Sequence, residues 1–145
     1  AEVARRLYAL GCYEISLGDT IGAGRPEETA RLIERCASEV PVEALAGHFH
    51  DTWGMAIANV HVALSLGVRT FDSSVAGLGG CPYSPGASGN VATEELLYLL
   101  HGMGFETGID LEAVARVGTR ISAELGIANR SRAGLALAAR SAARP

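Results

Sequence analysis

Two histidines separated by one residue form the most distinctive pair of potential metal ligands in the sequence. His48 and His50 follow a short apolar run, and on an extended strand side chains two residues apart project to the same face. Both imidazoles could therefore bind one cation, although two unliganded histidines are the simpler alternative. Asn90 offers an amide oxygen, which hard cations also accept, but it precedes a predicted helix and could cap that helix instead. Two imidazoles with oxygen donors suit Mg, Mn or Zn.

A cysteine and an aspartate are the candidates for proton transfer. Cys81 lies in the segment GLGGCPY at residues 77–83, which contains enough glycine to bend closely around a ligand and to move as a lid. Asp19 follows another apolar run and could act as a general acid or base, or could cap the loop after it. Cys12 and Cys36 fall in a predicted strand and a predicted helix, so we expect both to be buried.

The composition excludes several classes of function. All 12 basic residues of the 145 are arginine, so no lysine can form a Schiff base or complete a Gly-Lys-Ser/Thr phosphate-binding loop. The net charge of -4 disfavours nucleic acid as a partner. The three cysteines are odd in number and lack Cys-x-x-Cys spacing, which is typical of a reducing compartment. We expect a cytoplasmic protein that binds a small molecule and no membrane.

The candidate residues follow predicted strands. Apolar runs predict strands at residues 12–17, 44–48 and 68–72, and apolar residues at helical spacing predict helices at 26–40, 55–66, 91–100 and 111–125. Strands that alternate with helices predict a parallel sheet, either a doubly wound sheet or a (β/α)8 barrel. Both architectures place their active sites at the carboxyl ends of the strands, where the candidate residues lie.

Residues 129–145 form a tail rich in arginine that contains no acidic residue. Its arginines are Arg130, Arg132, Arg140 and Arg144. We expect a solvated helix or a frayed end and assign the tail no function.

Three motifs together resemble one family of enzymes. Residues 72–90, DSSVAGLGGCPYSPGASGN, look like the signature loop of the hydroxymethylglutaryl-CoA lyases, and HFHDTWG at 48–54 and ISLGDTIGAG at 15–24 match other motifs of that family. The resemblance extends to about Gly126. Isopropylmalate and homocitrate synthases share the His-x-His pair and the barrel, but they are not expected to have the Gly-Gly-Cys-Pro-Tyr lid.

The resemblance implies a (β/α)8 barrel that binds a divalent cation, Mg or Mn, through His48, His50 and Asn90, with an Asp near the first strand as a further ligand. It implies cleavage of 3-hydroxy-3-methylglutaryl-CoA to acetyl-CoA and acetoacetate. In that reaction Cys81 would protonate the acetyl-CoA enolate, and Asp19 or His48 would belong to the relay that removes the hydroxyl proton. The expected partner is therefore an acyl-CoA substrate.

The sequence also departs from the family's pattern. Phe49, Trp53 and Glu95 stand where members often have Cys, Tyr and Asp. The family's Arg-Asp pair on the first barrel strand, which supplies a metal ligand and an arginine for the oxyanion, has no counterpart before Cys12. A (β/α)8 barrel needs about 250 residues.

We therefore expect residues 1–128 to form the C-terminal part of a TIM barrel whose N-terminal strands are absent. Such a part would be inactive alone, and its exposed sheet edges would favour a homo-oligomer or association with the missing N-terminal half. A condensing synthase of the same superfamily and a non-catalytic half-barrel are the alternatives.

Overall fold

The structure is a computed structural model that describes residues 1–80 and 89–143. The chain divides into two compact units. We call residues 1–72 the sheet unit, and residues 73–80 together with 89–143 the helical unit. The predicted lid residue Cys81 lies outside the described residues.

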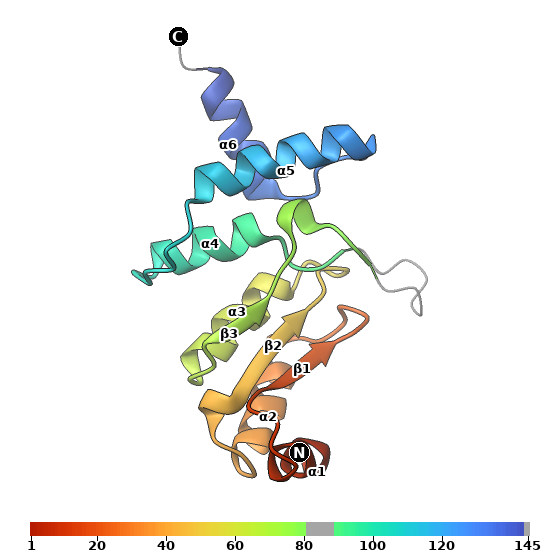
Figure 1. Cartoon of the computed structure of the whole chain (residues 1–145), viewed down its shortest axis with the longest axis vertical. Coiled ribbons are helices and arrows are strands. Elements are labelled where there is room, and N and C mark those ends of the chain that lie inside the picture. The colour runs from red at the N-terminus through yellow and green to blue at the C-terminus, as the bar shows by residue number, and fades with distance from the viewer. Residues whose placement is uncertain (81–88, 144–145) are drawn as a thin grey trace. The chain divides into compact units, whose positions relative to one another are not determined.

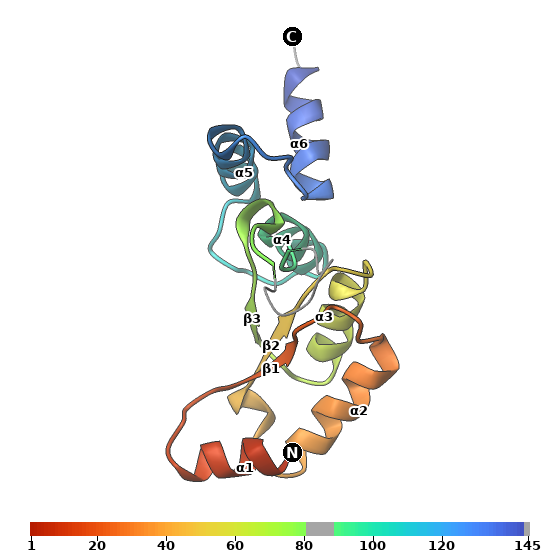
Figure 2. The same ribbon diagram turned by 90° about the vertical axis from the view of Figure 1, so that its right-hand side faces the viewer.

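The sheet unit contains three parallel strands in the order β1-β2-β3. Its elements are α1 (Glu2–Ala9), β1 (Ile15–Asp19), α2 (Pro26–Ala37), the 3-10 helix η1 (Val42–Ala44), β2 (Leu45–Phe49), α3 (Ala56–Ser65) and β3 (Thr70–Asp72). Helices α2 and α3 cover the same face of the sheet (Figures 1 and 2). The predicted α/β class, with strands and helices alternating along a parallel sheet, is confirmed in this unit.

The core of the sheet unit lies along the central strand. Leu45 and Ala46 on β2 are buried, as are Val60 and Ala63 on α3 and Ile33 on α2. The apolar side chains of each helix recur at the spacing of one helix face, so they meet those of the strand in one core. Removing these side chains from water stabilises the unit. This packing holds β2 in place, and the carboxyl end of β2 contains His48 and leads directly to His50.

The first strand begins at Ile15, later than predicted, and Cys12 is exposed rather than buried. The reason is the unpredicted helix α1, which ends at Ala9 and is followed by a left-handed glycine, Gly11, with a φ of 93°. The backbone N–H of Cys12 then donates to the carbonyl of Leu7, so Cys12 belongs to the turn that ends α1. Cys36 is buried in α2, as predicted.

The helical unit contains the 3-10 helix η2 (Val75–Gly77), α4 (Thr93–Gly102), α5 (Leu111–Leu125) and α6 (Arg132–Ala142). Asp110, the residue before the predicted helix 111–125, caps α5, because its carboxylate accepts the N–H groups of Glu112 and Ala113. The arginine-rich tail forms α6, which contacts both α4 and α5. No helix in the described ranges is long and apolar enough to cross a membrane.

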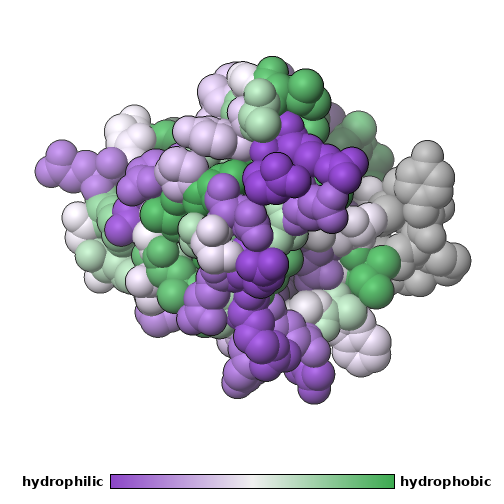
Figure 3. Space-filling model, turned by 90° about the horizontal axis from the view of Figure 1, so that it is seen from below, coloured by the Kyte–Doolittle hydropathy of each residue, from purple (hydrophilic) through white to green (hydrophobic). Residues whose placement is uncertain are grey.

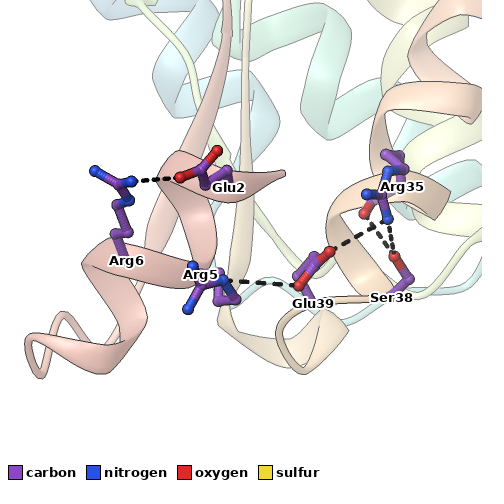
Figure 4. A network of polar contacts seen from close by, with 6 residues as sticks. All are labelled: Glu2, Arg5, Arg6, Arg35, Ser38 and Glu39. Carbon is purple, nitrogen blue, oxygen red and sulfur yellow. Dashed lines mark hydrogen bonds and ion pairs between the residues drawn. The ribbon is translucent and has the colours of Figure 1, made fainter.

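A network of charged side chains joins α1 to the end of α2 (Figure 4). Glu39 pairs with Arg35 at 3.3 Å and with Arg5 at 3.9 Å, and Arg35 donates to Ser38. Exposed ion pairs of this kind contribute little stability, about 0 to 1 kcal/mol each, so we assign the network no function.

Figure 3 shows hydrophilic side chains with hydrophobic ones between them on the face seen from below.

Candidate metal centre

The carboxyl end of β2 brings the two histidines together. The Nε2 atoms of His48 and His50 lie 3.3 Å apart, with ring centroids separated by 5.3 Å and ring planes tilted by 45°. His48 is the fourth residue of β2, and His50 follows the end of the strand. Both imidazoles therefore lie on one face, as predicted.

The separation of these two nitrogens suits a shared cation. Two nitrogen ligands at about 2.1 Å from one cation lie about 3.0 to 3.4 Å apart when the angle between the bonds is about 90 to 110°. The observed 3.3 Å between the Nε2 atoms of His48 and His50 falls in this range. The distance between the two nitrogens is therefore that of two adjacent ligands of one divalent cation, and without a cation it is also that of a hydrogen bond between the two rings.

Asp72 orients one of the two imidazoles. The register of the parallel strands sets Asp72 on β3 beside His48 on β2. Nδ1 of His48 lies 3.0 Å from an Asp72 oxygen, and the Ser16 hydroxyl donates to the same oxygen at 3.3 Å. A carboxylate on Nδ1 holds the proton there and leaves the lone pair on Nε2, as in many metal-binding histidines.

His50 is held in the neutral state that a metal ligand needs. Its side chain is buried, and Nδ1 has no hydrogen-bond partner within the described part of the chain. Burial lowers the pKa of His50, and the neighbouring His48 lowers it further, while the charge of Asp19 opposes the shift. A neutral imidazole is the form that binds a cation.

Asp19, at the end of β1, caps the loop that follows it. Its two carboxylate oxygens accept the backbone N–H groups of Ala23 at 3.2 Å and Gly24 at 2.9 Å. The buried Asn59 donates from its side chain to the carbonyl of Gly24 at 2.9 Å. The capping alternative is thus present in the structure, and a part for Asp19 in catalysis stays a prediction.

A close approach of two loops fixes the backbone beside His50. Gly22 has a φ of 65°, and a Cβ atom built there would lie 2.7 Å from the Thr52 hydroxyl oxygen and 2.9 Å from the His50 carbonyl oxygen. Only glycine fits this conformation and this space. The sequence motif contains Gly22, but its spacing does not reveal that the loop after β1 packs against the loop after β2.

Asn90 belongs to the helical unit and does not cap α4. The helix begins at Thr93, and Ala92 stands at its N-cap. The side-chain N–H of Asn90 donates to the carbonyl of Leu78 at 3.1 Å, and its Oδ1 atom is buried with no hydrogen-bond partner among the described residues. An amide oxygen in that state is available to a ligand, since buried polar atoms rarely lack a partner.

The structure brings together two of the predicted metal ligands. His48 and His50 lie side by side, whereas Asn90 is a residue of the other unit and Cys81 lies outside the described residues. In the described ranges no group of three or more His, Cys, Asp or Glu side chains could hold a metal. Sequence reasoning missed Asp72 as the partner of His48, although an aspartate at the end of a neighbouring strand was the available signal.

Comparisons with known proteins identify close relatives of the chain. Residues 1–121 match the family described as HMGL-like. The hydroxymethylglutaryl-CoA lyase of Pseudomonas mevalonii is 84% identical over 142 residues, which are 98% of this chain and 47% of that protein. The 3-hydroxy-3-isohexenylglutaryl-CoA/hydroxy-methylglutaryl-CoA lyase of Pseudomonas aeruginosa is 60% identical over 140 residues, which are 97% of this chain and 47% of that protein.

A solved structure also resembles the chain. The crystal structure of hydroxymethylglutaryl-CoA lyase from Pseudomonas aeruginosa has a TM-score of 0.91 and 60% sequence identity, over 96% of this chain and 46% of that one. The chain thus spans about half the length of the curated relatives that it matches.

Proposed function

The chain belongs to the HMGL-like family, and from this membership we propose that it forms the C-terminal part of a hydroxymethylglutaryl-CoA lyase with a divalent cation on His48, His50 and Asn90. The reaction is cleavage of 3-hydroxy-3-methylglutaryl-CoA to acetyl-CoA and acetoacetate. One observation carries the proposal: the Nε2 atoms of the two histidines lie 3.3 Å apart, at the spacing of two ligands of one cation.

The chemistry gives separate tasks to the residues of the sheet unit. A bound divalent cation, Mg or Mn, would lower the pKa of the substrate's C3 hydroxyl. Asp19 is the better acceptor for that proton, since the alternative, His48, is a poor base when its lone pair is on a metal. Loss of the proton lets the C2–C3 bond break, so that the ketone of acetoacetate forms and the electron pair passes to the acetyl-CoA enolate.

Cys81 is the proposed proton donor to that enolate. Protonation at carbon gives acetyl-CoA and leaves a thiolate, which regains its proton from solvent before the next turnover. The glycine-rich sequence around Cys81 supports this assignment, because such a segment can close over a bound acyl-CoA and exclude water.

The three parallel strands are proposed to be part of a (β/α)8 barrel. Within the described residues β1 and β3 each pair only with β2, so one edge of each carries backbone groups that can accept a further strand. The relatives are about twice as long as this chain, which supports an N-terminal half that supplies those strands together with the family's Arg-Asp pair. A second copy of this chain is the alternative partner.

A longer substrate is a second candidate. The Pseudomonas aeruginosa relative, 60% identical to this chain, is named for 3-hydroxy-3-isohexenylglutaryl-CoA as well as for the hydroxymethyl compound. By their names the two molecules share a 3-hydroxyglutaryl-CoA skeleton, and they differ in the apolar group on C3. The same histidine pair would therefore serve both reactions.

A chimera tests the proposal. The N-terminal half of the Pseudomonas mevalonii relative is placed before Ala1, and cleavage of each acyl-CoA compound is measured with Mg or Mn. The product followed is acetoacetate for the hydroxymethyl compound and the longer 3-oxo product for the isohexenyl compound. We expect turnover by the chimera and none by the 145-residue chain alone. A folded chimera without turnover on either compound would contradict the proposed activity, and robust turnover by the chain alone would contradict its incompleteness.

A further inference from the structure

A carboxyl group is completely buried in the helical unit. Glu94, in the first turn of α4, has 0% of its surface exposed, and both of its carboxylate oxygens lie 3.0 Å from the backbone nitrogen of Ala76. Gly118 on α5 makes room for it, because a Cβ atom there would lie 2.3 Å from Oε1 of Glu94. Burial of an acid is unfavourable unless its oxygens are well bonded. Burial raises the pKa of Glu94, and hydrogen bonds from its own backbone N–H and from that of Ala76 oppose the shift.

The residue that Glu94 holds has an unusual backbone. Ala76 has a φ of 57° and a ψ of 15°, and it is the one non-glycine residue with a positive φ in the described ranges. Left-handed backbone is unfavourable for alanine because Cβ crowds the following carbonyl. Glu94 accepts the N–H of Ala76, and the N–H of Arg130 donates to its carbonyl at 3.2 Å, so this peptide is held from both sides.

The left-handed turn directs the chain toward Asn90. Gly77 continues the turn with a φ of 64°, and a Cβ atom there would lie 3.4 Å from the Asn90 carbonyl oxygen. One residue later the carbonyl of Leu78 accepts the side-chain N–H of Asn90 at 3.1 Å. That bond sets the orientation of the amide and leaves its Oδ1 buried and unpaired.

We propose that Glu94 is a positioning residue, which holds Ala76 in the left-handed conformation and thereby places the Leu78 carbonyl that orients the Asn90 side chain. That the oriented Asn90 oxygen binds a metal rests on the proposed function. The contacts from Glu94 to Asn90 do not depend on it. Glu94 is not a catalytic residue, since it reaches Asn90 only through the backbone of residues 76–78.

The test follows the Ala76 amide and the Asn90 side-chain amide by NMR in the 15N-labelled chain. Glu94→Leu removes both acceptors, and we expect hydrogen exchange at Ala76 to accelerate by about tenfold or more and the Asn90 side-chain resonances to move toward those of an exposed amide. Glu94→Gln keeps one acceptor and should preserve most of both signals. The control is Leu97→Ala, which opens a cavity in the same helix at a residue that is 2% exposed and should leave the Asn90 signals in place.

A second variant separates positioning from packing. Glycine at position 76 removes the strain of the left-handed turn, so Ala76→Gly combined with Glu94→Leu should restore the Asn90 side-chain resonances. If Leu97→Ala disturbs Asn90 as much as Glu94→Leu does, or if the double variant restores nothing, Glu94 only fills the core and the proposal is wrong. The Mn2+ affinity of the chimera is a separate readout, which tests the metal role of Asn90. If Glu94→Leu moves the Asn90 signals and the double variant restores them, but neither variant changes the Mn2+ affinity, the positioning role of Glu94 holds and the ligand role of Asn90 is contradicted.

Discussion

The Nδ1 atom of His48 lies 3.0 Å from a carboxylate oxygen of Asp72, 24 residues away in the sequence. The contact exists because β2 and β3 pair in parallel, with His48 and Asp72 at matching positions. It fixes the ring so that Nε2 faces Nε2 of His50 at 3.3 Å. In the proposed metal site the carboxylate would hold the pair in place for a cation before one binds.

Replacing Asp72 tests this preparation. Asp72→Asn keeps the shape but weakens the acceptor on Nδ1, so we expect the Mn2+ affinity of the chimera to fall about tenfold to hundredfold with little change in stability. The control is Ser16→Ala, which removes only the other hydrogen bond to Asp72 and should lower the affinity far less. Equal affinities for the Asp72→Asn variant and the parent, by calorimetric titration, would show that His48 needs no such support.

The glycine beside His50 gives a prediction for stability. Gly22→Ala combines left-handed backbone with a Cβ atom 2.7 Å from the Thr52 hydroxyl oxygen, so it should destabilise the chain by more than the strain alone, which is about 1 to 2 kcal/mol. Gly54→Ala is the matched control, because Gly54 has a φ of 70° and nothing within 4 Å of its Cβ position. Urea unfolding measures both variants. A Gly22→Ala variant no less stable than Gly54→Ala would contradict the close approach of the loops.

Glu95 caps helix α6, which Glu94 does not. Its carboxylate accepts the Ser131 hydroxyl at 2.8 Å and the backbone N–H groups of Arg132 and Ala133, and thus caps α6. Glu95→Ala should cost about 1 to 2 kcal/mol and speed amide exchange in α6. Glu124→Ala, which breaks an exposed pair with Arg120, should cost only about 0.5 kcal/mol. Unchanged exchange in α6 of the Glu95→Ala variant would count against the cap.

The buried histidine predicts how stability depends on pH in the metal-free chain. Burial lowers the pKa of His50, so the folded state binds this proton more weakly than the unfolded state does. The stabilisation is complete above about pH 6.5, the ordinary histidine value, and is lost as the pH falls toward the lower folded value. Urea unfolding in the presence of a chelator should show this loss.

The matched variants for that measurement are two histidine replacements. His50→Gln should flatten the decline in stability below about pH 6.5, whereas His61→Gln, at an exposed position of α3, should leave it unchanged. A decline that persists in the His50→Gln variant would assign it to another group.

The proposed proton donor is tested with two cysteines. Cys81→Ser in the chimera should reduce acetoacetate formation by about a hundredfold or more, because a hydroxyl is a far weaker acid than a thiol. Cys12→Ser should have no effect, since Cys12 is exposed at the end of α1. Unchanged acetoacetate formation by the Cys81→Ser variant would contradict Cys81 as the proton donor, whereas retained condensing activity without acetoacetate formation would favour a condensing synthase.

Local patterns predicted the elements that carry the site. Apolar spacing predicted the three strands and the helices after them, and the extended geometry of β2 placed His48 and His50 on one face. The Asp110 cap was also visible, because capping involves only the next three residues. These features depend on residues near one another in the chain.

Contacts between distant segments could not be predicted. The His48–Asp72 pair depends on strand register, and the burial of Glu94 under Ala76 depends on how α4 packs against η2. Asn90 does not cap α4 because the N–H of Ser74 donates to the carbonyl of Val91, and the pairing of Ser74 with Ala92 keeps the chain extended to Thr93.

The central claim is that two imidazoles of this chain bind one cation, and pulsed electron paramagnetic resonance of Mn2+ in the chimera with 15N-labelled histidine tests it most directly. We expect couplings to two imidazole nitrogens in the parent and to one in the His50→Ala variant, with the helical content unchanged. Mn2+ that shows no histidine coupling, or the same coupling after His50→Ala, would contradict the claim.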